Sequence, residues 1–235
     1  MQLSKRLEAI AQMVTPGNRL VDVGCDHGYL PIALVQCRKI PRAIAMDVRE
    51  GPLSRARENI AAYGLDPYIE TRLSDGLEAL REKEGETLSI AGMGGPLMAK
   101  ILSKGDKIVR SFRELILQPQ SEVCEFRKYL WRRGLAIVEE DMVLEDGKFY
   151  TILKVVPEKS GQQEPYSDIE FYYGKFLLGG RNPVLYRYLR GEQEKNQRIR
   201  LGLQGNVNPN VQGRKRELLE EKRRIEAAMR YYENQ

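Results

Sequence analysis

The sequence predicts an α/β protein in which a mostly parallel sheet, covered by helices, ends in an antiparallel hairpin and precedes a helical segment. Up to Val156, short apolar runs alternate with amphipathic stretches, which is the pattern of a doubly wound sheet. The residues Glu145-Asp146-Gly147 separate the last two apolar runs and are typical of a hairpin turn. From Pro157 onward, glycines and prolines separate long polar stretches with helical periodicity.

Each predicted strand is an apolar run bounded by turn residues. The five parallel strands are residues 19–23, 43–46, 68–73, 88–91 and 114–117, and the hairpin strands are 135–144 and 148–156. The helix at 29–35 has Pro31 in its first turn, where a missing N–H breaks no hydrogen bond. Pro52 and Pro96 open two further helices, and we expect Ser121 to cap the helix that follows the fifth strand.

Composition excludes several classes of protein. The chain has 235 residues, a net charge of +5, 42% hydrophobic and 30% charged residues, which is enough apolar material for a packed core. No apolar run approaches the roughly 20 residues of a membrane span, and the first residues lack the apolar stretch of a signal peptide. Three scattered cysteines and one histidine argue against a disulfide framework and a zinc site. We therefore expect a cytoplasmic protein without membrane contact.

Periodicity changes at residue 157, which predicts two domains, 1–156 and 157–235. The second domain carries 15 Lys and Arg against 11 Asp and Glu. Its predicted helices are residues 168–178, 183–203 and 214–232. Apolar residues at helical spacing in the last helix need a partner, which the helix before it supplies. These residues are Leu218, Ile225, Met229 and Tyr232 on the last helix and Leu185, Leu189, Ile199 and Leu203 on the one before. We predict an antiparallel helical hairpin that resembles a short coiled coil.

The first chemical motif, VDVGCDHG at residues 21–28, ends the first strand. Gly24 lets the backbone approach a ligand, and the next helix offers free N–H groups at its N-terminus. Asp26 stands where a dinucleotide-binding fingerprint has its second glycine. An anionic side chain there favours a cationic or zwitterionic ligand over a pyrophosphate. A purely structural strand–helix turn is the alternative.

Acidic residues also follow the second and third strands. Asp47 lies 23 residues after Gly24 and can accept hydrogen bonds from two ribose hydroxyls, or it can cap the next helix. In Ser74-Asp75-Gly76, the carboxylate can accept a hydrogen bond from an adenine amino group while the glycine lets the base lie close. Acids after three strands are typical of sites for S-adenosylmethionine (SAM), and methyltransferases that bind SAM in this way also end in an antiparallel hairpin.

A glycine-rich turn, Ile90-Ala91-Gly92-Met93-Gly94-Gly95-Pro96, follows the fourth strand. Amino-directed methyltransferases have an acidic or Asn side chain, two prolines and an aromatic residue at this position, and this chain has none of that pattern. The three glycines instead expose backbone groups to a flat substrate, with Met93 as an apolar contact. A turn without a chemical role is the alternative.

In this order, the segments DVGCDHGYLP, AMDVREGPL, SDGL and AGMGG resemble the bacterial tRNA (adenine-22-N1)-methyltransferase family. The tail segments YGKFLL and NPVL extend the resemblance over nearly the whole chain, although Lys175 replaces a proline of the family pattern. The resemblance implies a Rossmann-like class I methyltransferase fold. It also implies SAM as methyl donor, S-adenosyl-L-homocysteine as product, no metal, and N1 of adenine 22 in the D-arm of tRNA as acceptor.

By position, the resemblance also assigns the site. The SAM-site residues are predicted to be Gly24, Cys25, Asp26, His27, Asp47, Val48, Ser74, Asp75, Gly76, Ala91 and Gly92. The residues predicted to face the target base are Gly92, Met93, Gly94 and Gly95.

Adenine N1 carries a free lone pair, so in-line attack on the methyl group needs neither a cysteine nucleophile nor an obligatory base. Orientation supplies much of the rate of such a reaction. The product base is cationic, and a nearby carboxylate stabilises the developing charge. We predict Asp26 for this role, with Asp75 as the competitor. Tyr29 is predicted to stack at the methyl site or to pack in the core, and His27 to contact SAM or the helix start.

A base inside a stem must be extruded before its N1 can react, and binding to phosphates is the obvious source of the required affinity. Basic residues of the tail are predicted to bind tRNA, namely Arg181, Arg187, Arg190, Arg214 and Lys215. Further candidate clusters are Lys5 and Arg6; Arg38, Lys39 and Arg42; and Arg127, Lys128, Arg132 and Arg133 around Trp131. Solvated helix faces are the alternative interpretation of each cluster.

Three other functions fit parts of the pattern. A small-molecule methyltransferase would carry a substrate cap on the sheet, where this chain has a basic helical tail. A non-catalytic RNA-binding protein with a SAM fold would not need the acids at positions 47 and 75. A nicotinamide oxidoreductase is disfavoured by Asp26 and by the closing hairpin. We expect the enzyme to act as a monomer.

Overall fold

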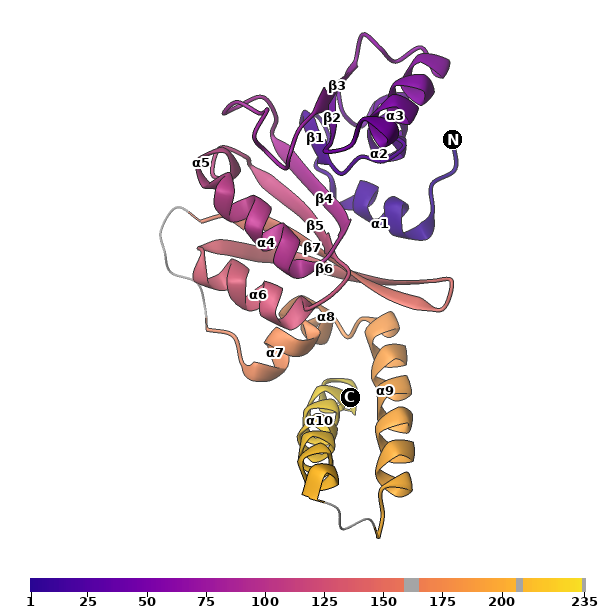
Figure 1. The fold of residues 1–235 in the computed structure, drawn as a ribbon, viewed down its shortest axis with the longest axis vertical. Helices are drawn as coiled ribbons and strands as arrows, with labels where there is room; N and C mark the ends of the chain where they lie inside the picture. Colours follow the sequence, from indigo (N-terminus) through magenta and orange to yellow (C-terminus); the bar gives the residue numbers. More distant parts are fainter. Residues whose placement is uncertain (159–164, 206–208, 234–235) are drawn as a thin grey trace. The chain divides into compact units, whose positions relative to one another are not determined.

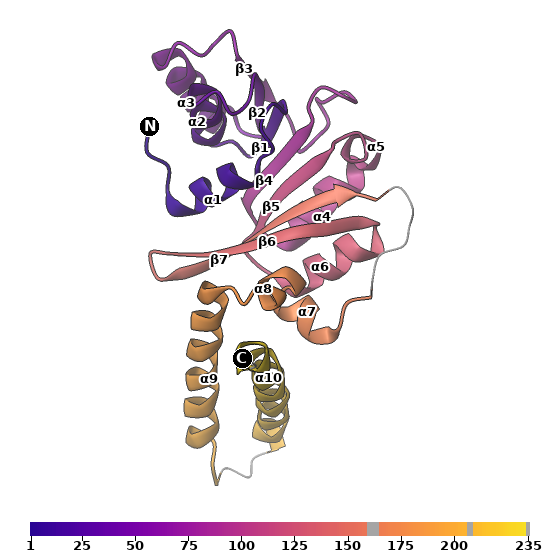
Figure 2. The ribbon, with the colours of Figure 1, turned by 180° about the vertical axis from the view of Figure 1, so that it is seen from behind.

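The computed structural model describes residues 1–158, 165–205 and 209–233. It divides into two compact units, Met1–Glu164 and Pro165–Gln235, each with its own buried apolar side chains. Strand β7 (Lys148–Pro157) extends through the position where the sequence suggests a boundary, and the first unit reaches Glu164. Figures 1 and 2 show the chain from opposite sides.

The first unit is built on a seven-stranded sheet in the order β3-β2-β1-β4-β5-β7-β6. The other strands are β1 (Leu20–Val23), β2 (Ala43–Asp47), β3 (Ile69–Leu73), β4 (Thr87–Met93), β5 (Glu114–Pro119) and β6 (Leu135–Glu145). Strands β1 to β5 pair in parallel, and β7 is antiparallel to β5 and β6. The predicted sheet and its closing hairpin are therefore confirmed.

Helices cover both faces of this sheet (Figure 1). They are α1 (Lys5–Met13), α2 (Tyr29–Gln36), α3 (Glu50–Ala62), α4 (Gly95–Lys104), α5 (Asp106–Val109) and α6 (Val123–Arg132). Alternate residues of the strands point to opposite faces. In β5, Leu115 and Leu117 belong to the core that α4, α5 and α6 complete, whereas Ile116 belongs to the core that α1, α2 and α3 complete.

The chain order places a switch point between β1 and β4. From β1 the chain proceeds to β2 and β3 on one side, and then returns to β4 and β5 on the other. In open parallel sheets, ligands bind outside the carboxyl ends of the strands at such a point. The loops after β1 and β4 therefore mark the expected site.

The hairpin turn has the conformation that its sequence predicts. Asp146 and Gly147 both have positive φ, at 49° and 75°, as a two-residue type I′ turn requires. Asp and Gly tolerate this conformation better than other residues do. The turn joins β6 and β7 in a register that pairs Glu145 with Lys148.

Helix α6 differs from the prediction in two ways. Its N-cap is Glu122, with φ 53°, rather than Ser121, because the Ser121 carbonyl accepts a hydrogen bond from Gly95 N at 3.1 Å. The sequence predicts Arg127 as part of a basic cluster that binds tRNA or forms a solvated helix face, but its side chain is 1% exposed and its Nε donates to Glu140 Oε1 at 2.8 Å. Arg127 is therefore a structural ion-pair partner and cannot bind phosphate.

The second unit consists of α7 (Asp168–Tyr173), α8 (Lys175–Gly179), α9 (Pro183–Gly202) and α10 (Pro209–Glu233). The sequence suggests one helix over 168–178, but Gly174 has φ 95° and breaks it in two. Helix α7 begins with a capping box formed by Ser167 and Glu170. Helix α9 begins at Asn182, whose Oδ1 accepts from the backbone N–H of Val184 and Leu185.

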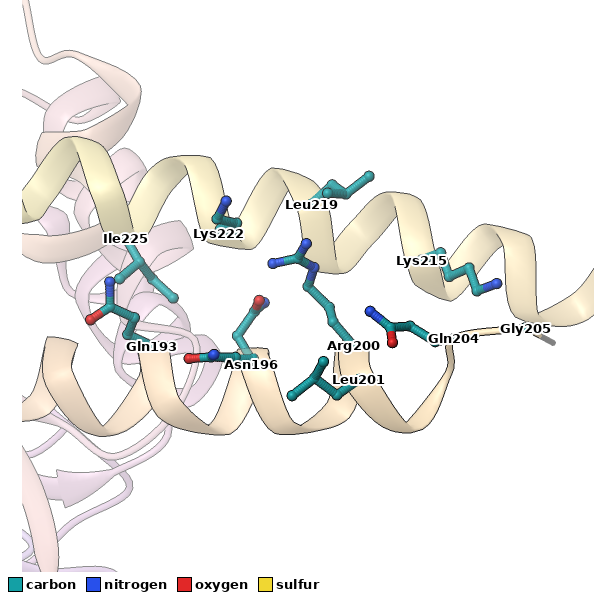
Figure 3. Close-up of a pocket in the computed structure, with 11 residues that line it drawn as sticks. Gln193, Asn196, Arg200, Leu201, Gln204, Gly205, Lys215, Leu219, Lys222 and Ile225 are labelled. Carbon is teal, nitrogen blue, oxygen red and sulfur yellow. The ribbon is translucent and has the colours of Figure 1, made fainter.

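Helices α9 and α10 lie side by side as the predicted helical hairpin (Figures 1 and 3). Leu185 and Leu189 of α9 and Leu218 and Ile225 of α10 are all buried. Asn196 is a buried polar residue among them, and its Nδ2 donates to the Leu218 carbonyl oxygen at 2.9 Å. Among the described residues, none of the helices combines the length and apolar character that crossing a membrane demands.

Candidate functional site

The loop between β1 and α2 contains the first motif. Gly24 has φ 78°, and its N–H donates to the Met46 carbonyl oxygen at 2.8 Å, which ties the end of β1 to β2. Gly28 is the N-cap of α2 with φ 72°, and a Cβ atom there would lie 3.3 Å from Cβ of Ala56. Both positions favour glycine because of their left-handed backbone. The turn places this loop at the N-terminus of α2, where helix N–H groups are available to a ligand.

The loop after β4 lies directly against the loop after β1. A Cβ atom on Gly24 would clash with the Cε methyl of Met93. The pairing of β4 with β5 shifts register between Ala91 and Met93, and Gly92 within this shift has φ 77°. The structure thus brings the turn predicted to face the target base next to the turn predicted to hold SAM.

Asp26, His27 and Tyr29 form the exposed side of the first loop. The Asp26 side chain is 65% exposed, and its Oδ2 lies 3.7 Å from Nε2 of His27. The His27 and Tyr29 rings stack with centroids 5.2 Å apart and an angle of 11°, and Asn59 Nδ2 donates to the His27 carbonyl oxygen at 2.9 Å. Because Tyr29 is 41% exposed, its ring is a surface platform and is not buried in the core.

Asp47 and Ser74 lie at the ends of neighbouring strands. Asp47 is 8% exposed, and its Oδ1 accepts from Arg49 N at 2.9 Å; Asp47 is not the N-cap of α3, because Arg49 occupies that position. The Ser74 hydroxyl donates to the Gly76 carbonyl oxygen at 3.0 Å and accepts from Ala79 N at 3.1 Å. The Ser74 side chain therefore shapes its own loop, and the Ser74 backbone N–H donates to the Asp47 carbonyl oxygen at 2.9 Å, which ties this loop to the end of β2.

Asp75 and Gly76 turn the third loop toward α4. The Asp75 carboxylate lies 3.7 Å from Lys104 Nζ, and its side chain is 66% exposed. Gly76 has φ 59°, and a Cβ atom there would lie 3.1 Å from Cγ2 of Ile101. Both residues line a small cavity of about 110 Å³. Val48, the remaining predicted contact after β2, is 58% exposed.

Carboxylates give the first loop a negative environment. Burial is the main cause that raises the pKa of Asp22 to about 7, and the nearby charge of Asp47 contributes to the rise. Burial, together with the charges of Asp22 and Asp47, also raises the pKa of the Cys25 thiol, so this thiol remains protonated. The backbone of Cys25 shapes the loop, because its N–H donates to the Met46 carbonyl oxygen and its carbonyl oxygen accepts from Gly28 N. A cationic ligand suits such an environment.

Sequence reasoning missed Asp22 and Gln118. Asp22 was read only as part of a buried strand, although a charged residue inside an apolar run is itself a signal. Gln118 of β5 is fully buried, and its Oε1 accepts from Gly92 N at 3.1 Å and from Arg6 Nη1 at 3.0 Å. The two residues of the predicted Lys5 and Arg6 cluster therefore have different surroundings. Lys5 is exposed, whereas Arg6 lies beside the glycine-rich turn.

The second unit has a groove of about 620 Å³ between α9 and α10, shown in Figure 3. Three cations line it, and we call Arg200, Lys215 and Lys222 the groove cations. Amide side chains such as Gln193 and Gln204 alternate with them, and no acidic residue is among the described lining residues. Such a lining suits a polyanion with hydrogen-bonding groups.

The other predicted tail residues lie outside this groove. Arg181, Arg187, Arg190 and Arg214 are all exposed. Arg214 forms an ion pair with Glu217, with Nη1 and Oε2 2.9 Å apart. The structure thus brings only Lys215 of the predicted set into a concave surface.

The residues of the first unit fit SAM. Buried carboxylates of Asp22 and Asp47 suit the sulfonium and ammonium charges, and Asp47 stands at the end of β2, where a ribose is bound in related folds. Within the described part of the chain, His, Cys, Asp and Glu side chains form no group of three that could hold a metal ion.

This fold and site define a SAM-dependent methyltransferase of class I. A family model described as a methyltransferase domain matches residues 3–153. The tRNA (adenine(22)-N(1))-methyltransferase of Bacillus subtilis is 34% identical over 203 residues, which cover 85% of this chain and 84% of the relative. The chain belongs to the tRNA (adenine(22)-N(1))-methyltransferase family.

Two solved structures are similar over nearly their full length. A Streptococcus pneumoniae protein in complex with S-adenosyl-L-methionine is 36% identical, with a TM-score of 0.85 over 97% of this chain and 100% of that chain. TrmK of M. capricolum, in complex with S-adenosyl-homocysteine, is 25% identical, with a TM-score of 0.83 over 98% of this chain and 99% of that chain.

Proposed function

We propose that this protein transfers a methyl group from SAM to N1 of adenine 22 in tRNA. The observation that supports the proposal is that the Met93 methyl lies where a Cβ atom of Gly24 would be, so the loop that we assign to the donor is next to the turn that we assign to the base. The name of the Bacillus subtilis relative states this reaction. The glycine-rich turn offers backbone groups to a planar base without an amino-directed catalytic side chain.

Bound SAM supplies an electrophilic methyl group on a sulfonium. The residues of this chain orient the reactants, because adenine N1 needs no deprotonation and the Cys25 thiol is held protonated by burial. We propose that the loops at the ends of β1 and β2 fix the donor, with the Asp47 carboxylate at the ribose hydroxyls. Correct alignment of N1 with the methyl–sulfur bond supplies much of the acceleration.

We assign stabilisation of the cationic adenine to Asp26 in preference to Asp75. Both side chains are about two-thirds exposed, but Asp75 has a cation nearby, since it lies 3.7 Å from Lys104 Nζ, which also pairs with Glu78. Asp26 belongs to the first loop beside the stacked rings of His27 and Tyr29. The exposed Tyr29 ring can stack on the extruded base, as aromatic side chains do in RNA recognition.

We further propose that the second unit binds the body of the tRNA. Extruding a base from a stem costs a few kcal/mol, which phosphate contacts must offset. The described lining of the groove holds three cations and no acidic residue, although Lys222 Nζ also lies 3.2 Å from Glu226 Oε1. The exposed arginines of α9, Arg187 and Arg190, extend this surface.

Methyl transfer from radiolabelled SAM to unmodified tRNA transcripts tests the proposal. We expect N1-methyladenosine in a transcript with adenine 22 and no product when that adenine is replaced by guanine. Transfer to another position, or SAM binding without transfer to any tRNA, would contradict it. The second outcome would favour a small-molecule substrate.

We also propose that the protein acts in the cytoplasm as a monomer. Its three cysteines, all within the described residues, form no disulfide, as is usual in a reducing compartment. Sedimentation equilibrium of the active protein, alone and with tRNA, measures the oligomeric state, and a stable dimer would contradict the monomer.

A further inference from the structure

Arg6 of α1 is held at the edge of the glycine-rich turn. Its Nη1 donates to Gln118 Oε1 at 3.0 Å, and its guanidinium lies over the Tyr150 ring, with Cζ 5.6 Å from the ring centroid. A Cβ atom on Gly92 would lie 3.6 Å from the same Nη1. The cation therefore stands next to the turn that we propose for the target base.

Gln118 fixes the position of this cation. The side chain of Gln118 is fully buried, and its Oε1 accepts from both Arg6 Nη1 and Gly92 N. Its Nε2 donates to the Pro119 carbonyl oxygen at 3.1 Å, so the amide cannot be flipped without breaking all three bonds. One buried acceptor thus sets the distance between the guanidinium and the backbone of the turn.

The charge of Arg6 has no carboxylate partner among the residues that the structure describes. Glu145 contacts the neighbouring residue Lys5, where its Oε1 accepts a hydrogen bond from the backbone N–H at 2.6 Å. An arginine has five N–H donors and stays charged at any physiological pH. Arg6 uses one of these donors on Gln118, so a planar pair of donors remains for an anion.

We propose that Arg6 binds a phosphodiester of the RNA strand next to the extruded adenine. This inference rests on the proposed function, since it takes tRNA as the substrate. The charge is partly exposed and oriented before the substrate arrives. The geometry of a guanidinium matches two phosphate oxygens, whereas an ammonium offers only a point charge. Arg6 thus anchors the backbone while the base enters beside Gly92.

The dependence of tRNA affinity on salt distinguishes a phosphate contact from a structural role. Each phosphate neutralised by a protein cation contributes about 0.7 to 0.9 to the slope of log K against log salt. We expect Arg6→Gln to weaken tRNA binding about tenfold, the loss of one charge-assisted contact, and to reduce the slope by that amount. The affinity for SAM and the Tm should stay at their wild-type values.

Two further variants sharpen the test. Arg113→Gln removes an exposed cation just before β5, at the opposite end of the strand from Gln118, and should change neither slope nor affinity. Gln118→Glu keeps an acceptor for Gly92 N but pairs the Arg6 charge. We therefore expect Gln118→Glu to lower the salt slope as Arg6→Gln does, whereas Arg6→Lys should retain the slope and lose affinity.

The proposal is overturned if Arg6→Gln keeps the wild-type salt slope, or if it lowers SAM affinity and Tm together. Either result would make Arg6 a support for the turn through Gln118. Because the slope is measured by binding alone, this failure is distinct from failure of the proposed function. The latter would show as absence of N1-methyladenosine with the wild-type protein.

Discussion

The protonation state of the buried Asp22 carboxyl affects the free energy of unfolding. Its side chain is buried in β1, and burial raises its pKa from 3.8 to about 7. A carboxyl whose pKa is higher in the folded than in the unfolded state favours folding while it is protonated. This contribution is fully present below pH 3.8 and is lost as the pH rises through about 7. Asp22→Asn removes the titration while retaining a group of similar size.

The size of the effect follows from the two pKa values. The difference between 3.8 and about 7 corresponds to about 4 kcal/mol at 1.36 kcal/mol per pKa unit, which is an upper estimate above pH 8. At pH 5 the wild type has lost only about 2 kcal/mol of this contribution. We therefore expect the stability of Asp22→Asn relative to wild type to rise by about 2 to 3 kcal/mol between pH 5 and pH 8.

Urea denaturation of both proteins at several pH values, without SAM, measures this difference. The variant and the wild type share all other titrating groups, so the contributions of these groups to the pH dependence cancel. Asp47 is the exception, because its charge acts on Asp22. A stability difference that stays constant from pH 5 to pH 8 would refute the reasoning. The pH dependence of SAM affinity provides a second measurement, because the positive charges of SAM favour the ionised Asp22 carboxylate. The SAM affinity of the wild type should rise with pH up to about 7. The SAM affinity of Asp22→Asn should not change in this way.

Three other predictions follow from single contacts. Gly24→Ala should lower SAM affinity several-fold by calorimetry, because the added methyl forces the Met93 side chain to move within the glycine-rich turn. Gly17→Ala has a similar positive φ and open space around it, so it should lose about 1 to 2 kcal/mol of stability and keep SAM affinity. Arg127→Met should destabilise the first unit by about 3 to 5 kcal/mol in urea denaturation, because Glu140 is left as a buried charge. Adding Glu140→Leu to this variant should restore most of the lost stability. If the double variant is no more stable than Arg127→Met, the result would contradict a buried ion pair. Replacing the groove cations by glutamine should weaken tRNA binding in a filter assay and leave SAM affinity unchanged, and equal loss of both would contradict separate roles of the two units.

The fold was predictable where local chemistry and long-range packing agree. The alternation of apolar runs and amphipathic stretches sets the order of strands and helices, and Asp146-Gly147 determines the hairpin turn through its positive φ angles. Helix ends were less predictable, because they depend on partners distant in sequence. Ser121 looks like a helix cap, yet its carbonyl is used by Gly95, and α6 begins one residue later.

The candidate site was predictable only where each motif follows a strand. Because the strands are parallel, Gly24, Asp47 and Asp75 had to meet at one edge of the sheet. The contact of Arg6 with Gln118 joins residues 112 positions apart and leaves no local pattern. Arg127 shows the converse, since its sequence neighbourhood is basic and exposed, but Glu140 on β6 draws it into the core.

A crystal structure of the protein with S-adenosyl-homocysteine and adenosine tests the central claim most directly. We expect the homocysteine sulfur above Gly24, the cofactor ribose hydroxyls on the Asp47 carboxylate, and the adenosine ring between Tyr29 and the Gly92–Gly95 turn with N1 facing the sulfur. Binding of either molecule away from the β1/β4 switch point, or a base whose N1 faces away from the sulfur, would contradict the account.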